Sequence, residues 1–199
     1  MEKKHHNNYI LVLYYSRYGA VKKLAEEIAL GIEANGIEAR LRSVPSLSST
    51  NKNHDLHENN DLFATLDDLR HCAGLALGSP TRFGNMAAPL KHFLDSTSDL
   101  WLSGALINKP ATVFSSTASL HGGQETTLLS MMLPLLHHGM VIMGTPFTEE
   151  DLINTKSGGT PYGVTHVTFG DHHAPLTVVE KRLAYNTGKR LAQLVLKLA

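Results

Sequence analysis

Hydrophobic residues along the chain fall into short unbroken runs separated by segments of helical periodicity. The first run, residues 9–15 (YILVLYY), shows no alternation of polar and apolar positions, which is typical of a strand covered on both faces of a parallel sheet. Residues 20–34 then place Val21, Leu24 and Ile28 on one helical face and lysines and glutamates on the other. The pattern predicts a buried strand followed directly by an amphipathic helix.

Further hydrophobic runs predict the remaining strands, at residues 37–43, 73–80, 110–117 and 140–144. The first of these alternates apolar and charged residues, as an edge strand does, and the other three are nearly continuous, as buried strands are. Helical segments lie between or after these runs, at about 63–70, 82–97, 123–139 and 175–198. Strands that alternate with helices predict an α/β fold with a parallel, doubly wound sheet of five strands.

Length, charge and cysteine content narrow the class of protein. The 199 residues are enough for one domain with its own core, in which we expect residues 1–8 to be a disordered leader and 45–62 a surface loop. Lys and Arg total 18 and so do Asp and Glu, so charge gives no reason to expect a nucleic acid or an anionic membrane as partner. No apolar run reaches the roughly 18 residues of a membrane helix. The single cysteine, Cys72, excludes an internal disulfide and fits the reducing cytoplasm.

Three of the predicted strands end in loops rich in hydroxyl and glycine residues. These loops are 16–21 (SRYGAV), 79–86 (SPTRFGNM) and 115–125 (SSTASLHGGQE). In an open parallel sheet, ligands bind outside the carboxyl ends of the strands, where the strand order reverses. If the five predicted strands, numbered along the chain, have the order 2-1-3-4-5, the three loops meet in one crevice.

The first loop has the chemistry of a phosphate site. The Ser16 hydroxyl and the N–H groups at the start of the following helix can bind an anion, and Gly19 permits close approach of the backbone. A tight strand-to-helix turn explains the same residues about as well. Neither G-x-G-x-x-G nor G-x-x-x-x-G-K-[ST] occurs, so neither a Rossmann dinucleotide site nor a nucleotide-hydrolysing P-loop is supported.

The second loop could hold a planar group, because Thr81, Arg82 and Phe83 offer a hydroxyl, a charge and a ring in consecutive positions. The structural alternative is a solvated arginine beside a core phenylalanine. Trp101 could likewise cover a flat ligand or pack in the core.

Histidines near the ends of elements are also ambiguous. Of His137 and His138, one could simply cap the carboxyl end of a helix. The segment 171–173 (DHH) is only loosely like a metal site, and we expect no metal.

Several of these motifs together carry a family resemblance. In chain order, the segments VLYYSRYG, GSPTRFGNM, LWLSGAL, VFSSTASLHGGQE, LLHHGMV and GGTPYGVTH resemble those of the WrbA-type NAD(P)H:quinone oxidoreductases. The resemblance runs from about residue 9 to 198. It implies a flavodoxin-like three-layer sandwich that binds FMN, in a homotetramer with sites at subunit contacts.

The resemblance also implies roles for individual residues. The FMN phosphate loop would be Ser16, Arg17, Tyr18, Gly19, Ala20 and Val21; the isoalloxazine loop Thr81, Arg82 and Phe83; and the third loop Ser116, Thr117, Ala118, Ser119, and less firmly Leu120 and His121. Tyr18 would meet the nicotinamide and Trp101 would flank the substrate cavity. His137 would approach the flavin, from the same or a neighbouring subunit. His137 and Arg82 would be the catalytic residues, the first near the quinone and the second near negative charge on the reduced flavin.

Two departures from the family pattern affect the expected site. Ala20 stands where the family usually has a histidine, and ASLHGG replaces its glycine-rich GTGGG segment. Leu120 and His121 are bulkier than glycine, so the width of the substrate cavity is open.

The implied activity is two-electron reduction of quinones by NAD(P)H through bound FMN. No residue that would read the nicotinamide nucleotide's ribose can be placed, so the choice between NADH and NADPH is open. A flavodoxin-type electron carrier is one alternative, although such carriers tend to be acidic and this chain is balanced. A flavin-bound regulatory interaction protein is another, without a recognition element for nucleic acid to support it.

Overall fold

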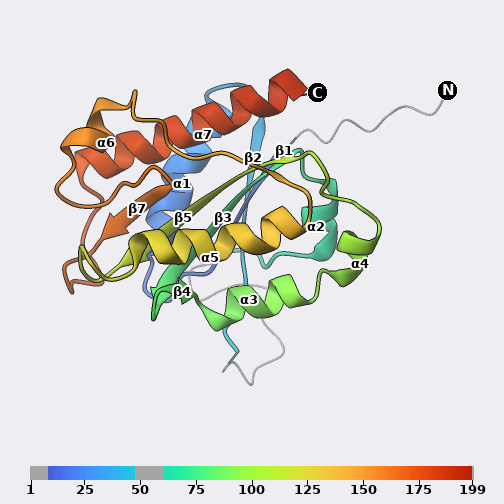
Figure 1. The fold of residues 1–199 in the computed structure, drawn as a ribbon, viewed down its shortest axis with the longest axis horizontal. Helices are drawn as coiled ribbons and strands as arrows, with labels where there is room; N and C mark the ends of the chain where they lie inside the picture. Colours follow the sequence, from blue (N-terminus) through green and yellow to red (C-terminus); the bar gives the residue numbers. More distant parts are fainter. Residues whose placement is uncertain (1–8, 48–60, 199) are drawn as a thin grey trace.

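A parallel sheet with helices on both faces forms the centre of the computed structural model, which describes residues 9–47 and 61–198 (Figure 1). The strands are β1 (Tyr9–Tyr14), β2 (Glu38–Ser43), β3 (Gly74–Arg82), β4 (Asn85–Met86), β5 (Pro110–Thr117), β6 (Val141–Ile142) and β7 (Val164–Val167). The order β2-β1-β3-β5-β6 confirms the expected 2-1-3-4-5. The expectations for residues 1–8 and for most of 45–62 lie outside the described residues.

The fifth position of the sheet is shared by two short strands, where the sequence predicts one strand at 140–144. β6 pairs only with the first two residues of β5, and β7 pairs with its last four. Between them the chain leaves the sheet, forms the short helix α6 (Glu150–Asn154) and returns. The prediction of a single strand is therefore wrong in extent. Two of the four residues of β7, Thr165 and His166, are polar, so this strand does not appear as an apolar run in the sequence.

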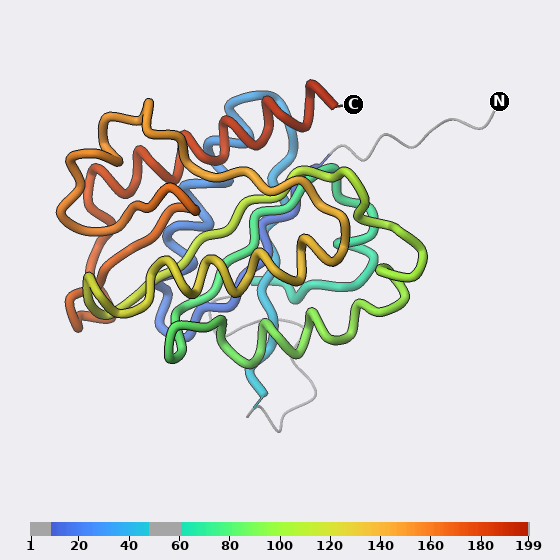
Figure 2. Tube along the Cα trace, viewed as in Figure 1, coloured from blue at the N-terminus to red at the C-terminus, as the bar shows by residue number. Residues whose placement is uncertain are grey.

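The helices form the outer layers of the sandwich. α1 (Ala20–Glu33) and α7 (Val178–Leu198) pack on one face of the sheet, and α3 (Ala88–Asp95) and α5 (Gln124–His137) on the other; α2 (Leu66–His71) and α4 (Ser98–Leu102) are short. Figure 2 shows the sheet enclosed between these layers. Within 9–47 and 61–198, no helix combines the length and apolar character needed to cross a membrane.

β1 shows why its sequence lacks an alternating pattern. All six of its residues are buried. Ile10, Val12 and Tyr14 belong to the core beneath α1 and α7, whereas Leu11 and Leu13 belong to the core beneath α3 and α5. Because helices cover both faces, every position in the strand must be compatible with burial.

The helix predicted at 82–97 begins only at Ala88. β3 continues to Arg82 and pairs antiparallel with β4, so residues 81–86 form a hairpin instead of a first helical turn. Pro89 then stands in the first turn of α3, where its missing N–H costs no helical hydrogen bond.

α1 and α7 cross with their backbones in contact. A Cβ atom on Gly31 would lie 2.0 Å from the carbonyl oxygen of Tyr185, and one on Gly188 would lie 2.0 Å from that of Ile28. Only glycine permits such an approach. The crossing fixes α1 on the sheet, and with it the loop that leads from β1 into α1.

Candidate functional site

The loop after β1 ends in an open helix start whose N-cap residue is a glycine. Gly19 is the N-cap of α1 and has left-handed backbone (φ +90°). Apart from its two chain neighbours, no described residue has an atom within 4 Å of the place where a Cβ would stand. Ser16 is buried, and its Oγ accepts hydrogen bonds from the N–H groups of Gly19 (3.1 Å) and Lys22 (3.4 Å). The first turn of α1 contains no acidic residue. The positive end of the helix dipole is therefore available to an anion.

A hydrogen-bonded network centred on Asp61 connects the two ends of this loop. Tyr14, at the end of β1, donates from its hydroxyl to Asp61 (2.6 Å), and Lys22 Nζ donates to the other carboxylate oxygen (2.8 Å). Burial and the bond to Asp61 raise the pKa of Tyr14, so its proton stays in place. The network ties β1 and the first turn of α1 to the chain that returns at residue 61.

The second loop is a tight hairpin with an exposed aromatic ring. Thr81 pairs with Met86 and Arg82 with Asn85, leaving Phe83 and Gly84 as a turn with both backbones left-handed (φ +53° and +76°). Such turns normally carry Asn or Gly at the first position. The Phe83 side chain is fully exposed. A phenylalanine in a strained backbone with nothing packed over it indicates a role other than folding.

The Thr81 hydroxyl joins the second loop to the third. Its Oγ1 accepts from Thr127 Oγ1 (2.8 Å) and from the N–H of Gly84 (3.3 Å), and it donates to the carbonyl of Gly122 (3.4 Å). Thr117, at the end of β5, donates to the carbonyl of Ser119 and so shapes the third loop. The two loops are thus held side by side.

The structure brings most of the predicted residues to one crevice of about 150 Å³. Its lining includes Ser16, Arg17, Tyr18, Ala20 and Val21 from the first loop, Thr81 and Arg82 from the second, and Ser116, Thr117 and Ala118 from the third. Gly19 lies within the first loop. Phe83, Ser119, Leu120 and His121 follow the lining residues directly in the chain but do not line the crevice themselves.

A fourth loop, after β7, also lines the crevice and was missed from the sequence. Thr168 and His172 from this loop, together with Pro80 from the second, complete the lining among the described residues. The His172 ring stacks on Tyr18, with ring centroids 4.3 Å apart and planes inclined by 25°. The guanidinium of Arg17 lies 5.2 Å from the centroid of the Tyr18 ring. The sequence does contain a sign of this loop. Residues 164–168 would have been predicted as a strand if polar residues such as Thr165 and His166 had been accepted within a buried strand.

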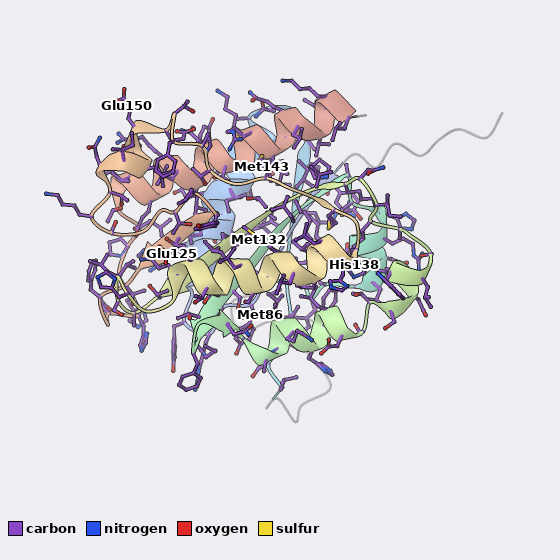
Figure 3. All side chains as sticks on the ribbon, in the orientation of Figure 1. Met86, Glu125, Met132, His138, Met143 and Glu150 are labelled. Atoms are coloured by element: carbon purple, nitrogen blue, oxygen red, sulfur yellow. The ribbon has the colours of Figure 1, made fainter. Side chains whose placement is uncertain are left out.

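Trp101 and His137 lie at the opposite edge of the sheet. α5 begins after the carboxyl end of β5 and runs back along the sheet, so its last residues reach the amino edge; Figure 3 labels His138 there and Glu125 at the other end of the helix. Trp101 Nε1 donates to the carbonyl of His137 (2.9 Å). Within a single chain, neither residue joins the crevice, because the length of α5 separates them from it.

His138 is the structural member of the histidine pair. It is buried, and its Nε2 lies 2.8 Å from Thr97 Oγ1. Burial, and secondarily the neighbouring His137, lowers the pKa of His138, which favours the neutral ring. Across the described ranges 9–47 and 61–198, no three His, Cys, Asp or Glu side chains gather as a metal site would require.

The residues of the crevice fit a phosphorylated, polyhydroxylated ligand. A helix start with open space at Gly19 suits a phosphate, and the hydroxyl groups of Ser116 and Thr117 suit a sugar-alcohol chain. Thr81 and Arg82 line the crevice from the hairpin, and the exposed Phe83 ring follows them in the chain. FMN has the same three parts in the same order: a phosphate, a ribityl chain and a flat ring.

Comparisons with known proteins agree with this assignment. The sequence pattern of the family described as NADPH-dependent FMN reductase matches residues 10–150. A WrbA-like flavodoxin from Agrobacterium tumefaciens has a similar structure, with a TM-score of 0.68 at 23% identity over 96% of this chain and 98% of that one. A flavodoxin from the domain Archaea gives 0.62 at 20% identity over 94% and 97%.

A larger protein contains the same fold as one part. The flavodiiron protein from Giardia intestinalis matches 98% of this chain but only 37% of its own length, with a TM-score of 0.65 and 15% identity. These structural likenesses establish the flavodoxin-like fold, and the family match covers well over half of the sequence. The chain therefore belongs to the NADPH-dependent FMN reductase family of flavin-dependent oxidoreductases, and FMN is its cofactor.

Proposed function

We propose that this protein is an FMN-dependent NAD(P)H:quinone oxidoreductase of the WrbA type. The observation that carries the proposal is the convergence of the loops after β1, β3 and β5 on one crevice with a phosphate-binding helix start. Bound FMN would supply the redox chemistry, accepting a hydride from NAD(P)H and passing two electrons to a quinone. The protein's part is to hold, orient and shield the reacting groups.

In this proposal, the first loop holds the phosphate and the other two hold the chain and ring. Ser16 to Val21 surround the helix start, so their N–H groups and the Ser16 hydroxyl would bind the phosphate. Thr81, Arg82 and Phe83 would lie along the ring, with Ser116 to Ser119 beside them. Arg82 is exposed at the mouth of the crevice, where its charge would favour negative charge on the reduced ring.

The nicotinamide would enter beside Tyr18. This side chain is half exposed at the crevice and stacks on His172, so the two rings present a joined aromatic surface. An aromatic surface at the rim suits a flat nicotinamide or quinone ring.

The homotetramer forms part of the proposal because two of the residues proposed for the site, Trp101 and His137, do not reach the crevice of their own chain. Trp101 and His137 are exposed at the far edge, and exposed apolar side chains surround them: Leu102, Ile107, Leu133 and Leu136. Such a patch favours contact with a second copy. That contact would bring His137 and Trp101 of one subunit to the crevice of another, where His137 could donate a hydrogen bond or a proton to the quinone. A cytoplasmic location, where NAD(P)H is available, also belongs to the proposal.

Flavin titration and steady-state kinetics test this function. The purified protein should shift the visible bands of FMN at one equivalent per chain and then oxidise NADH or NADPH with benzoquinone as acceptor. Failure to turn over any of these pairs when loaded with FMN would overturn the proposal. Rapid transfer to a c-type cytochrome in place of benzoquinone would favour the one-electron carrier instead.

A further inference from the structure

A second hollow, larger than the flavin crevice, adjoins it on the side of α3. It has a volume of about 460 Å³ and is lined by Tyr15, Arg17, Arg82, Asn85, Lys91 and the residues that lead into α3. Arg17 and Arg82 also line the flavin crevice. The two spaces therefore share a wall that is made of the two arginines.

The charged side chains that line the hollow, among the residues that the structure describes, are all cationic. Within residues 9–47 and 61–198, its lining contains three cations, Arg17, Arg82 and Lys91, and no carboxylate. α3 begins beside the hollow, because Ala87 and Ala88 are lining residues, and its first turn contains no acidic residue. Three cationic side chains around one space attract an anion. The nearest opposing charge on α3 is Asp95, one turn beyond Lys91 and paired with it.

We propose that this hollow binds the adenosine diphosphate half of the nicotinamide dinucleotide. Its volume lies within the range of small-molecule sites, and arginine guanidinium groups match phosphate geometry. The FMN phosphate is assigned to the start of α1, whereas Lys91 lines the hollow and not the flavin crevice, so the hollow would hold a second anion. Because the arginines form a shared wall, a dinucleotide held there by its pyrophosphate can extend its nicotinamide end into the flavin crevice, whose lining includes Tyr18. The inference rests on the proposed oxidation of NAD(P)H.

Binding of ADP to the FMN-loaded protein tests the site without turnover. Saturation with FMN first keeps ADP from the phosphate loop, and titration calorimetry then measures the dissociation constant. The wild-type protein should bind ADP, and the affinity should fall as salt rises from about 0.05 to 0.5 M, because the contacts are charge pairs. Lys91→Gln should raise the dissociation constant roughly fivefold, and Asp95→Asn should lower it about twofold, because it removes the charge opposing Lys91. The KM for NAD(P)H should shift in the same directions.

Lys197→Gln supplies the matched control. This lysine is exposed on α7, on the opposite face of the sheet, so its loss should leave ADP affinity unchanged. Equal ADP affinity in wild type, K91Q and D95N would overturn the placement of the site. Absence of ADP binding in a protein that oxidises NAD(P)H would overturn the inference and leave the proposed function standing. Conversely, ADP binding that responds to K91Q in a protein without turnover would remove the proposed function and keep the anion site.

Discussion

At the scale of single residues, backbone conformation identifies positions where folding and function make different demands. Phe83 and Asn108 both have left-handed backbones, with φ of +53° and +67°. Asparagine tolerates this region, and phenylalanine does not. Because the Phe83 ring is fully exposed, packing does not compensate its strain. The residue therefore lowers stability at the place where the flavin ring is proposed to lie.

Phe83→Asn should consequently make the protein more stable and less able to bind FMN. Relief of the backbone strain should raise the free energy of unfolding by about 0.5–1 kcal/mol. Loss of the ring should weaken FMN binding several-fold. Denaturant unfolding without FMN and a flavin titration measure the two effects separately. A less stable variant with unchanged FMN affinity would show that Phe83 serves the fold.

Gly19 allows a comparison with a glycine far from the site. Gly19 and Gly36 lie before and after α1, both have positive φ, and a Cβ added at either would meet no atom within 4 Å. Alanine at either position should therefore cost a similar amount of stability, about 1 kcal/mol. Only Gly19→Ala places a methyl group where the phosphate is proposed to bind, so it alone should weaken FMN binding, about tenfold. Equal FMN affinities in the two variants would argue against a phosphate at this helix start.

At the scale of elements, one carboxylate connects β7, α7 and the chain between them. Glu180 is fully buried on α7 and accepts hydrogen bonds from the N–H groups of Gly158 (2.9 Å), Val167 (3.1 Å) and Thr177 (2.8 Å), and from His166 Nδ1 (3.0 Å). Val167 is the last residue of β7, immediately before the loop that carries His172. Glu180 thus helps to position the fourth loop of the crevice, which follows β7 and carries Thr168 and His172.

The pKa of Glu180 predicts an acid-sensitive stability. Burial alone would raise this pKa, but the hydrogen bonds from His166, Thr177 and Val167 outweigh it and lower the value to about 2, from 4.5. The ionised group therefore stabilises the fold fully above about pH 4.5, and this contribution, about 3 kcal/mol at most, is lost as pH falls toward 2. Glu180→Gln should be less stable at pH 7 and should lose less stability between pH 5 and 2. Parallel stability curves for the two proteins would exclude this role.

At the scale of the whole molecule, exposed apolar side chains on α5 mark the surface through which the proposed tetramer would form. Leu129, Leu133 and Leu136 follow one another at helical spacing on the side of α5 that faces away from the sheet, and all are exposed. A leucine stripe of this kind is unfavourable in water unless another surface covers it. Its carboxyl end adjoins His137 and Trp101.

Leu133→Asp should dissociate the proposed tetramer. Leu133 is 62% exposed in the single chain, so the variant should still fold, whereas a charge at a subunit contact should disrupt it. Leu196→Asp on α7 is the control, because Leu196 is 56% exposed on the other face of the sheet. Light scattering after size exclusion measures the mass, and quinone reduction should fall with it only in the first variant. A wild-type protein that is monomeric, or an L133D tetramer, would contradict this arrangement.

Local patterns accounted for much of the fold and part of the site. The apolar run at 9–15 indicates a strand that is buried on both faces, and the periodic segment at 20–34 indicates a helix that is buried on one face. β1, α1 and the loop between them could therefore be predicted. The hairpin at 81–86 was mistaken for the start of a helix, because Met86 continues the apolar spacing of α3 although it belongs to β4. β7 was not predicted because it contains a buried histidine. His166 can be buried there because it pairs with Glu180, which lies 14 residues further along the chain.

The sequence by itself determined the kinds of elements, their order along the chain and the presence of hydroxyl- and glycine-rich loops after three strands, because these depend on neighbours within a few residues. Only the tertiary structure decided that a fourth loop places His172 on Tyr18 and that Arg17 and Arg82 divide two adjoining spaces. It also decided that Trp101 and His137 lie across the molecule from their expected ligand. Those placements depend on which strands pair and on the direction and length of α5, which are set by contacts between segments far apart in the sequence.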